Sequence, residues 1–168
     1  MQMTELARLL HGRVVLVGIG TEQRGDDDVG LRVARTLRTA VGQRSSQATL
    51  VGSIAVGTSP ETYVVFINSY SPDVILLIDA VDMDAMPGAV AILAAEQLKE
   101  RPAWNTHRPP LGLFMDYLAQ RTGARVLLAG IQAESLDWGT RTSNAARRGA
   151  NELIRTLRSI FREGDVRL

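Results

Sequence analysis

The sequence predicts one α/β domain of three layers (αβα), with helices on both faces of a mostly parallel, doubly wound β-sheet. Short apolar runs alternate with longer segments of helical periodicity along the whole chain, which is typical of βαβ units. The chain has 168 residues, 45% of them hydrophobic, which suits a single domain with a substantial core. We therefore expect residues 1–168 to form one domain.

The first half of the chain is predicted to contain three strands separated by two helices. We expect strands at 13–18, 48–56 and 74–78, and the last (VILLI) is continuous enough to be buried on both faces. The segment 59–61 (SPE) supplies an N-cap, a proline and an acid, and predicts a helix from there to about residue 69. Apolar residues at every fourth position predict the earlier helix: Val29, Val33, Leu37 and Val41.

The second half is predicted to contain two strands and two helices. We expect an edge strand at 88–93, a helix at about 110–121 and the last central strand at 124–129. The final helix has the clearest pattern, because its apolar residues between 146 and 161 fall in an arc of roughly 120° and its arginines lie opposite. Gly164 is expected to end it.

Composition excludes several classes of function. The formal net charge of +1 gives no field that would favour nucleic acid or a membrane surface, so we expect neither as a partner. The absence of cysteine excludes a disulfide scaffold, a thiolate metal site and a cysteine nucleophile. It also fits a reducing compartment. Residues 1–13 lack the apolar core of a signal peptide. We therefore expect a cytoplasmic protein, and nothing in the sequence demands more than a monomer.

Acidic residues gather in two short segments, each directly after a predicted strand. The carboxyl ends of parallel strands share one edge of a sheet, and ligands bind there. Clustered like charges raise one another's pKa unless a cation neutralises them. The sequence therefore predicts a metal or a positively charged partner at this edge. Six of the eighteen acidic residues belong to the two segments: Asp26, Asp27, Asp28, Asp79, Asp82 and Asp84.

The individual aspartates allow structural roles as well. Successive residues at a helix start point about 100° apart, so one or at most two of Asp26, Asp27 and Asp28 can face a single point. Acids in a first helical turn also interact well with the helix dipole, which is the alternative role for this triplet. Asp79 ends an apolar run, where a carboxylate needs a close partner. It could instead accept loop hydrogen bonds.

One of the two histidines is placed to join the acids. His11 lies in the leading segment, where we expect a surface residue. His107 precedes Pro109 and Pro110, which stiffen the loop before a predicted helix. A lone histidine is more often structural than a ligand. With two carboxylates, however, it makes a mixed nitrogen and oxygen donor set that suits nickel, zinc, manganese or iron.

Two nucleotide or phosphate functions fit the motifs less well. Gly18 and Gly20 suggest a dinucleotide fingerprint, but the third glycine would fall at Gln23, and three aspartates crowd the helix start that would have to bind phosphate. A phosphoacceptor receiver domain would need a lysine near the last strand. The chain's only lysine is Lys99, far from that position.

Five short motifs in order resemble the hydrogenase maturation protease family, over about residues 14–157. Its members are endopeptidases that trim the C-terminal extension of the large subunit of [NiFe] hydrogenases. The resemblance implies a phosphorylase/hydrolase-like αβα domain. The motifs are 18–21 (GIGT) with 24–30 (RGDDDVG), 57–61 (GTSPE), 78–83 (IDAVDM) with 87–88 (PG), 106–107 (TH) with the leucine pattern 111–118, and 130–132 (GIQ).

The resemblance implies site residues and an unusual use of metal. The family's metal-contacting residues fall on Asp27, Asp79 and His107, which we expect to be the catalytic and metal-binding set. The nickel is expected to arrive in the large-subunit precursor, so the resting site is empty or holds another divalent metal. Nickel insertion would then be the checkpoint for cleavage. Either the nickel as a Lewis acid or a clustered aspartate as general base would activate the peptide bond or a water.

Three positions depart from the family pattern. Thr21 stands where asparagine is common, Asp28 where glycine is common, and Ala133 where a proline often follows the Ile–Gln pair. None belongs to the three implied ligands, so we expect them to affect which hydrogenase is served. A non-catalytic metal-binding or assembly factor on the same fold is the alternative function, because the same ligands would serve it.

Overall fold

A five-stranded, mostly parallel sheet forms the centre of the molecule in a computed structural model that describes residues 3–99 and 110–162. The first four strands in spatial order run parallel, and the shortest one pairs antiparallel at an edge, as predicted for an edge strand. In spatial order the strands are β2 (Ala48–Gly57), β1 (Gly12–Ile19), β3 (Val74–Val81), β5 (Arg125–Gln132) and β4 (Val90–Leu93).

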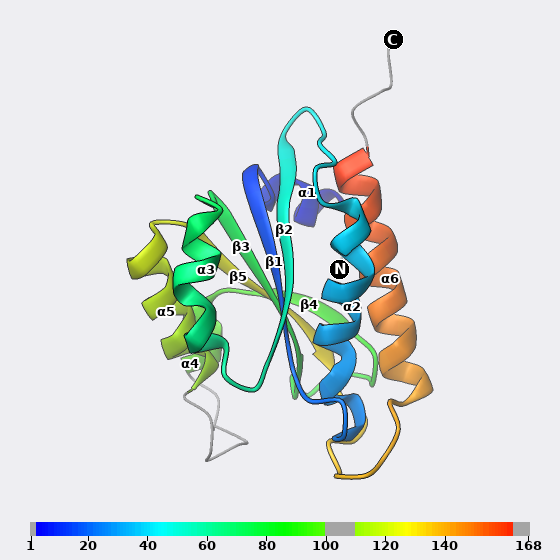
Figure 1. Cartoon of the computed structure of the whole chain (residues 1–168). Coiled ribbons are helices and arrows are strands. Elements are labelled where there is room, and N and C mark those ends of the chain that lie inside the picture. Colours follow the sequence, from blue (N-terminus) through cyan, green and yellow to red (C-terminus); the bar gives the residue numbers. More distant parts are fainter. Residues whose placement is uncertain (1–2, 100–109, 163–168) are drawn as a thin grey trace.

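Helices cover both faces of this sheet, which confirms the predicted three layers (Figure 1). One face carries α1 (Met3–Leu9), α2 (Val29–Leu37) and α6 (Asn144–Arg162), and the other carries α3 (Val64–Ser69), α4 (Ala95–Lys99) and α5 (Leu111–Thr122). Three short 3-10 turns complete the described elements: η1 (Gly25–Asp28), η2 (Arg38–Ala40) and η3 (Pro60–Tyr63).

The core is divided into two clusters because successive side chains of a strand point to opposite faces. In β1, Val14 and Leu16 pack with α1, α2 and α6, whereas Val15 and Val17 pack with α3 and α5. Residues 74–78 of β3 are fully buried, which confirms the expectation from its continuous apolar run. The sheet is therefore held from both sides, and its strand ends have fixed positions.

Several boundaries differ from those predicted. The strands β3 and β5 both extend three residues further, because Asp79, Ala80 and Val81 pair with residues 130–132 of β5. Asp79 thus lies within a strand, and the loop begins after Val81. Val41 is 44% exposed and outside α2, because the chain turns after η2 and the Gly42 amide donates to the Leu50 carbonyl of β2.

Two short helices lie in segments for which no helix was firmly predicted. In α1 and directly after it, Leu6 and Leu10 are completely buried against α6 and the sheet. The helix α4 connects the edge strand β4 to the segment before α5. The predicted helix end at Gly164 lies outside the described residues. No helix among residues 3–99 and 110–162 is both long and apolar enough to cross a membrane.

Candidate functional site

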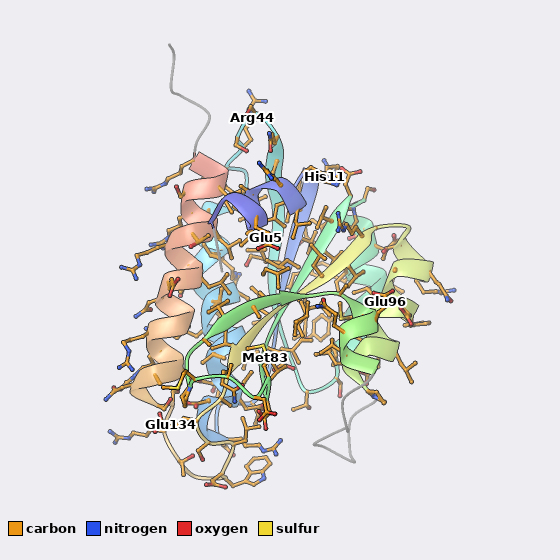
Figure 2. All side chains as sticks on the ribbon, turned by 180° about the vertical axis from the view of Figure 1, so that it is seen from behind. Glu5, His11, Arg44, Met83, Glu96 and Glu134 are labelled. Carbon is orange, nitrogen blue, oxygen red and sulfur yellow. The ribbon has the colours of Figure 1, made fainter. Side chains whose placement is uncertain are left out.

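The candidate site lies at the carboxyl edge of the parallel strands, where the segments after β1, β3 and β5 come together. Figure 1 shows this edge at the lower end, where β1 leads into the start of α2 and where α6 also begins. Met83, after β3, and Glu134, after β5, lie near this end in Figure 2. His11 lies at the opposite end and is exposed, so the expectation of a surface residue is confirmed.

Asp27 is held in the tight turn between β1 and α2. It is 3% exposed and belongs to the 3-10 turn η1. Its backbone carbonyl accepts a hydrogen bond from the Thr21 amide at 3.1 Å. A Cβ atom on Gly20, whose φ is +148°, would lie 1.7 Å from the same oxygen, so only glycine allows this close approach. The close approach at Gly20 and the Thr21 hydrogen bond therefore help to position Asp27.

Asp79 lies on the neighbouring strand at the same edge. It is 6% exposed, pairs with Gly130 of β5, and follows Ile78, which pairs with Gly18 of β1. The first turn of α2 sits directly on both strands, since a Cβ on Gly30 would lie 2.2 Å from the Ile78 carbonyl oxygen and 2.3 Å from that of Ile19. The turn η1 contacts β3. Two buried carboxylates thus come from adjoining elements at one edge.

Asp26 has a different role from its neighbour. It is 1% exposed, and its carboxylate links the η1 turn to the segment that leads into α6. Oδ2 accepts hydrogen bonds from the amides of Glu134 (2.7 Å) and Ser135 (3.3 Å) and from the Ser143 hydroxyl (3.0 Å). Oδ1 accepts one from the Ser143 amide at 2.6 Å. These contacts occupy the carboxylate, so Asp26 is a structural residue.

Asp28 also reaches the segment before α6. Its carboxylate accepts a hydrogen bond from the Thr142 hydroxyl at 2.8 Å. Burial raises the pKa of Asp28 above its ordinary value of 3.8, while Thr142 and the nearby Arg32 act in the opposite direction. Asp28 is the N-cap of α2, yet it makes no side-chain capping hydrogen bond. Its hydrogen bond therefore joins two loops across the site instead of capping the helix.

Backbone contacts join the same two loops. The Gly25 amide donates to the Thr140 carbonyl at 3.3 Å, and the Gly139 amide donates to the Gln23 carbonyl at 2.8 Å. Arg24 donates from Nε to the Leu136 carbonyl at 3.0 Å. Its guanidinium carbon lies 5.9 Å from the centre of the Trp138 ring. Trp138 is 69% exposed at the rim of the site, so this loop pair presents an aromatic surface beside the buried acids.

Gln132, at the end of β5, fixes the loop after β3. Its Oε1 accepts hydrogen bonds from the amides of Met83 (2.6 Å) and Ala85 (3.3 Å), and its Nε2 donates to Asp82 Oδ1 (3.2 Å) and the Ala133 carbonyl (3.0 Å). Sequence analysis identified the GIQ motif but gave Gln132 no role. A polar residue ending a buried strand was the available signal. Asp82 therefore serves the loop as a hydrogen-bond acceptor.

The third predicted site residue, His107, lies outside the described residues. Within residues 3–99 and 110–162, no group of three or more histidine, cysteine or acidic side chains could hold a metal ion. Of the three predicted ligands, the described residues therefore include two, Asp27 and Asp79. Completion of that set by His107 remains a prediction.

The fold defines the class as a doubly wound α/β protein, a class in which ligands bind where neighbouring parallel strands end. Comparison with known proteins is more specific. The family model described as "Hydrogenase maturation protease" matches residues 31–159. The chain belongs to the hydrogenase maturation protease (HycI) family and is a peptidase. This family acts on the precursor of the hydrogenase large subunit.

Individual relatives agree with this assignment. A relative from Methanocaldococcus jannaschii is 29% identical over 153 residues, which span 90% of this chain and 89% of the relative. The hydrogenase 3 maturation protease of Escherichia coli K12 is 30% identical over 120 residues, or 71% of this chain and 72% of that protein. The crystal structure of the [NiFe] hydrogenase maturation protease HycI from Thermococcus kodakarensis gives a TM-score of 0.78 at 27% identity, covering 95% and 99% of the two chains.

Proposed function

We propose that this peptidase removes the C-terminal extension of a [NiFe] hydrogenase large-subunit precursor after nickel has been inserted. Nickel is part of the substrate in this proposal, and Asp27, Asp79 and His107 recognise it. The observation that carries the proposal is the placement of two buried aspartates, Asp27 and Asp79, on adjoining elements at the carboxyl edge.

The donor chemistry supports a cationic ligand at this edge. Two charged carboxylates on adjoining elements of one edge would repel each other, and a divalent cation bound between them would relieve that repulsion. Carboxylate oxygens with one imidazole nitrogen are suitable ligands for nickel and leave coordination positions open for groups of the substrate. A site that gains its cation only from the substrate discriminates a loaded precursor from an empty one.

Hydrolysis of the scissile bond sets further requirements. Water must lose a proton as its oxygen attacks the carbonyl carbon, and the leaving nitrogen must gain a proton as the C–N bond breaks. Either the substrate's nickel polarises the carbonyl or the water, or one aspartate takes the proton. A pH–rate profile of Asp27→Asn and Asp79→Asn at saturating precursor distinguishes the two routes, because loss of a general base removes the acidic limb of the profile.

The site assignment is tested by Asp27→Asn, Asp79→Asn and His107→Ala, each incubated with nickel-loaded precursor. We expect each to reduce processing by about 100-fold or more while the circular dichroism spectrum stays unchanged. His11→Ala is the matched control, because His11 is exposed at the opposite end of the sheet. Wild-type cleavage by two of the three variants would overturn the assignment. Binding of the loaded precursor without cleavage by the wild-type chain would favour the assembly factor.

A further inference from the structure

A groove that is lined by neither Asp27 nor Asp79 runs along the seam between α2 and α6. Its volume is about 810 Å³, and the turn between β3 and β4 closes one side. The floor there is tightly packed: a Cβ on Gly149 of α6 would lie 2.3 Å from the Gly88 carbonyl oxygen. Figure 1 shows α2 and α6 side by side over most of the length of α2. The groove is therefore part of the rigid fold.

The walls of the groove are strongly basic. Four arginines line it (Arg32, Arg148, Arg155 and Arg158), against one acid, Glu152. Within the described residues, the one ion pair joins Arg35 to Glu22, and neither of these lines the groove. Arg32 makes a 3.5 Å hydrogen bond to the neutral Asn151 and also lies near the Asp28 carboxylate. Folding thus gathers like charges that an anionic partner would stabilise.

The groove begins beside the candidate site. The helix α2 starts directly after the η1 turn that carries Asp27, and α6 starts directly after the loop that Asp26 fixes. The turn at residues 86–89 follows the loop after Asp79. All three walls therefore originate at the carboxyl edge, and a chain that lies in the groove can continue to the buried aspartates.

We propose that this groove binds an acidic polypeptide segment of the precursor and thereby increases the affinity of the enzyme for it. This inference rests on the proposed function for the identity of the substrate. Charge complementarity favours an acidic chain, and Met86, 80% exposed at the rim, adds an apolar contact of the kind that a peptide side chain uses. A nucleic acid fits less well, because Glu152 would meet its phosphates and the lining contains no aromatic side chain.

The test is a charge reversal with a matched control. In the groove variant, Arg148→Glu is combined with Arg155→Glu. In the control, Arg147→Glu is combined with Arg162→Glu, which makes the same charge change on exposed positions of the same helix outside the groove. Binding of nickel-loaded precursor is measured by calorimetry at two salt concentrations. Single-turnover cleavage at saturating precursor is measured separately.

We expect the groove variant to raise the Kd for precursor about tenfold or more and to flatten its salt dependence, with the saturated cleavage rate unchanged. The control should stay close to wild type. If the glutamate pair does not fold, Arg148→Gln with Arg155→Gln removes the charges without reversing them. A wild-type Kd for the groove variant, or an equal loss of affinity in both double variants, would overturn the proposal that the groove binds the precursor. Either result would leave the proposed function intact.

The two proposals fail separately. If the wild-type chain binds the precursor through the groove and never cleaves it, the groove stands and the proposed function fails. If the groove variant loses affinity for a single-stranded DNA oligonucleotide but none for the precursor, the partner is a nucleic acid and the peptide proposal is wrong. Absence of precursor binding by the wild-type chain contradicts both proposals.

Discussion

The Asp26 carboxylate offers a direct test of how the site is held together. In Asp26→Asn the shape of the side chain is kept, but an NH₂ group replaces one oxygen. The oxygen of the amide can still accept the three hydrogen bonds that Oδ2 accepts from the Glu134 amide, the Ser135 amide and the Ser143 hydroxyl. The NH₂ group then faces the Ser143 amide, which donates at 2.6 Å to Oδ1. Two donors meet in a site where residue 26 is 1% exposed.

The expected cost follows from those contacts. Hydrogen bonds to a charged acceptor are worth about 1.5–3 kcal/mol, and a buried donor left without a partner costs about 1–3 kcal/mol. One such bond is lost outright and the others lose their charge assistance, so we expect a loss of about 2–4 kcal/mol in the free energy of unfolding. For a chain of this size that lowers Tm by roughly 5–15 °C.

Urea unfolding and calorimetry measure this change. Asp28→Asn is the matched control, because Asp28 accepts a single hydrogen bond from a hydroxyl that can rotate, and we expect a change below about 1 kcal/mol. An Asp26→Asn protein within about 0.5 kcal/mol of wild type would refute the structural role of this carboxylate.

Three further predictions concern the elements around the site. Burial raises the pKa of Asp28, so the folded chain holds this proton more tightly than the unfolded chain, and the stability contributed at this position falls as pH rises from 3.8 through the folded pKa. Urea unfolding at about pH 4 and pH 7 measures this effect. Relative to Asp28→Asn, the free energy of unfolding of wild type should be higher at about pH 4 than at about pH 7, and the same difference at both pH values would contradict this. Gln132→Leu should cost about 1–3 kcal/mol, since the Met83 and Ala85 amides lose their acceptor. Gln97→Leu, an exposed glutamine with one backbone partner, should cost less than about 1 kcal/mol, and equal losses would argue against the loop-fixing role. Gly149→Ala should cost about 1–3 kcal/mol because its methyl group would meet the Gly88 carbonyl, and an unchanged denaturation midpoint would show that the seam can open.

Most of the fold could be predicted because its elements carry local signals. The continuous apolar run at 74–78 predicts burial on both faces of β3. The apolar face and the opposite arginine face of α6 predict which side of that helix is buried. Boundaries that depend on distant partners could not be predicted. The extension of β3 through Asp79 follows from pairing with β5, about fifty residues away in sequence. Val41 continued the periodicity of α2, but the return to β2 takes it out of the helix.

The acidic loops show the same limit at the candidate site. Sequence analysis located the carboxyl edge and showed that Asp26, Asp27 and Asp28 cannot share one direction. It could not assign them individually, because the partners of Asp26 lie 108 to 117 residues away. The role of Gln132 was missed, and the groove between α2 and α6 could not be located, for the same reason, since both arise only when the loops and helices pack together.

The central claim is that nickel in the precursor licenses cleavage by this chain. Intact-mass spectrometry of the [NiFe] hydrogenase large-subunit precursor, incubated with the protein with and without loaded nickel, tests it most directly. The account predicts that a discrete C-terminal peptide is lost only from the nickel-loaded form. Cleavage of both forms would contradict the recognition of substrate nickel by Asp27, Asp79 and His107, and cleavage of neither would contradict the proposed activity.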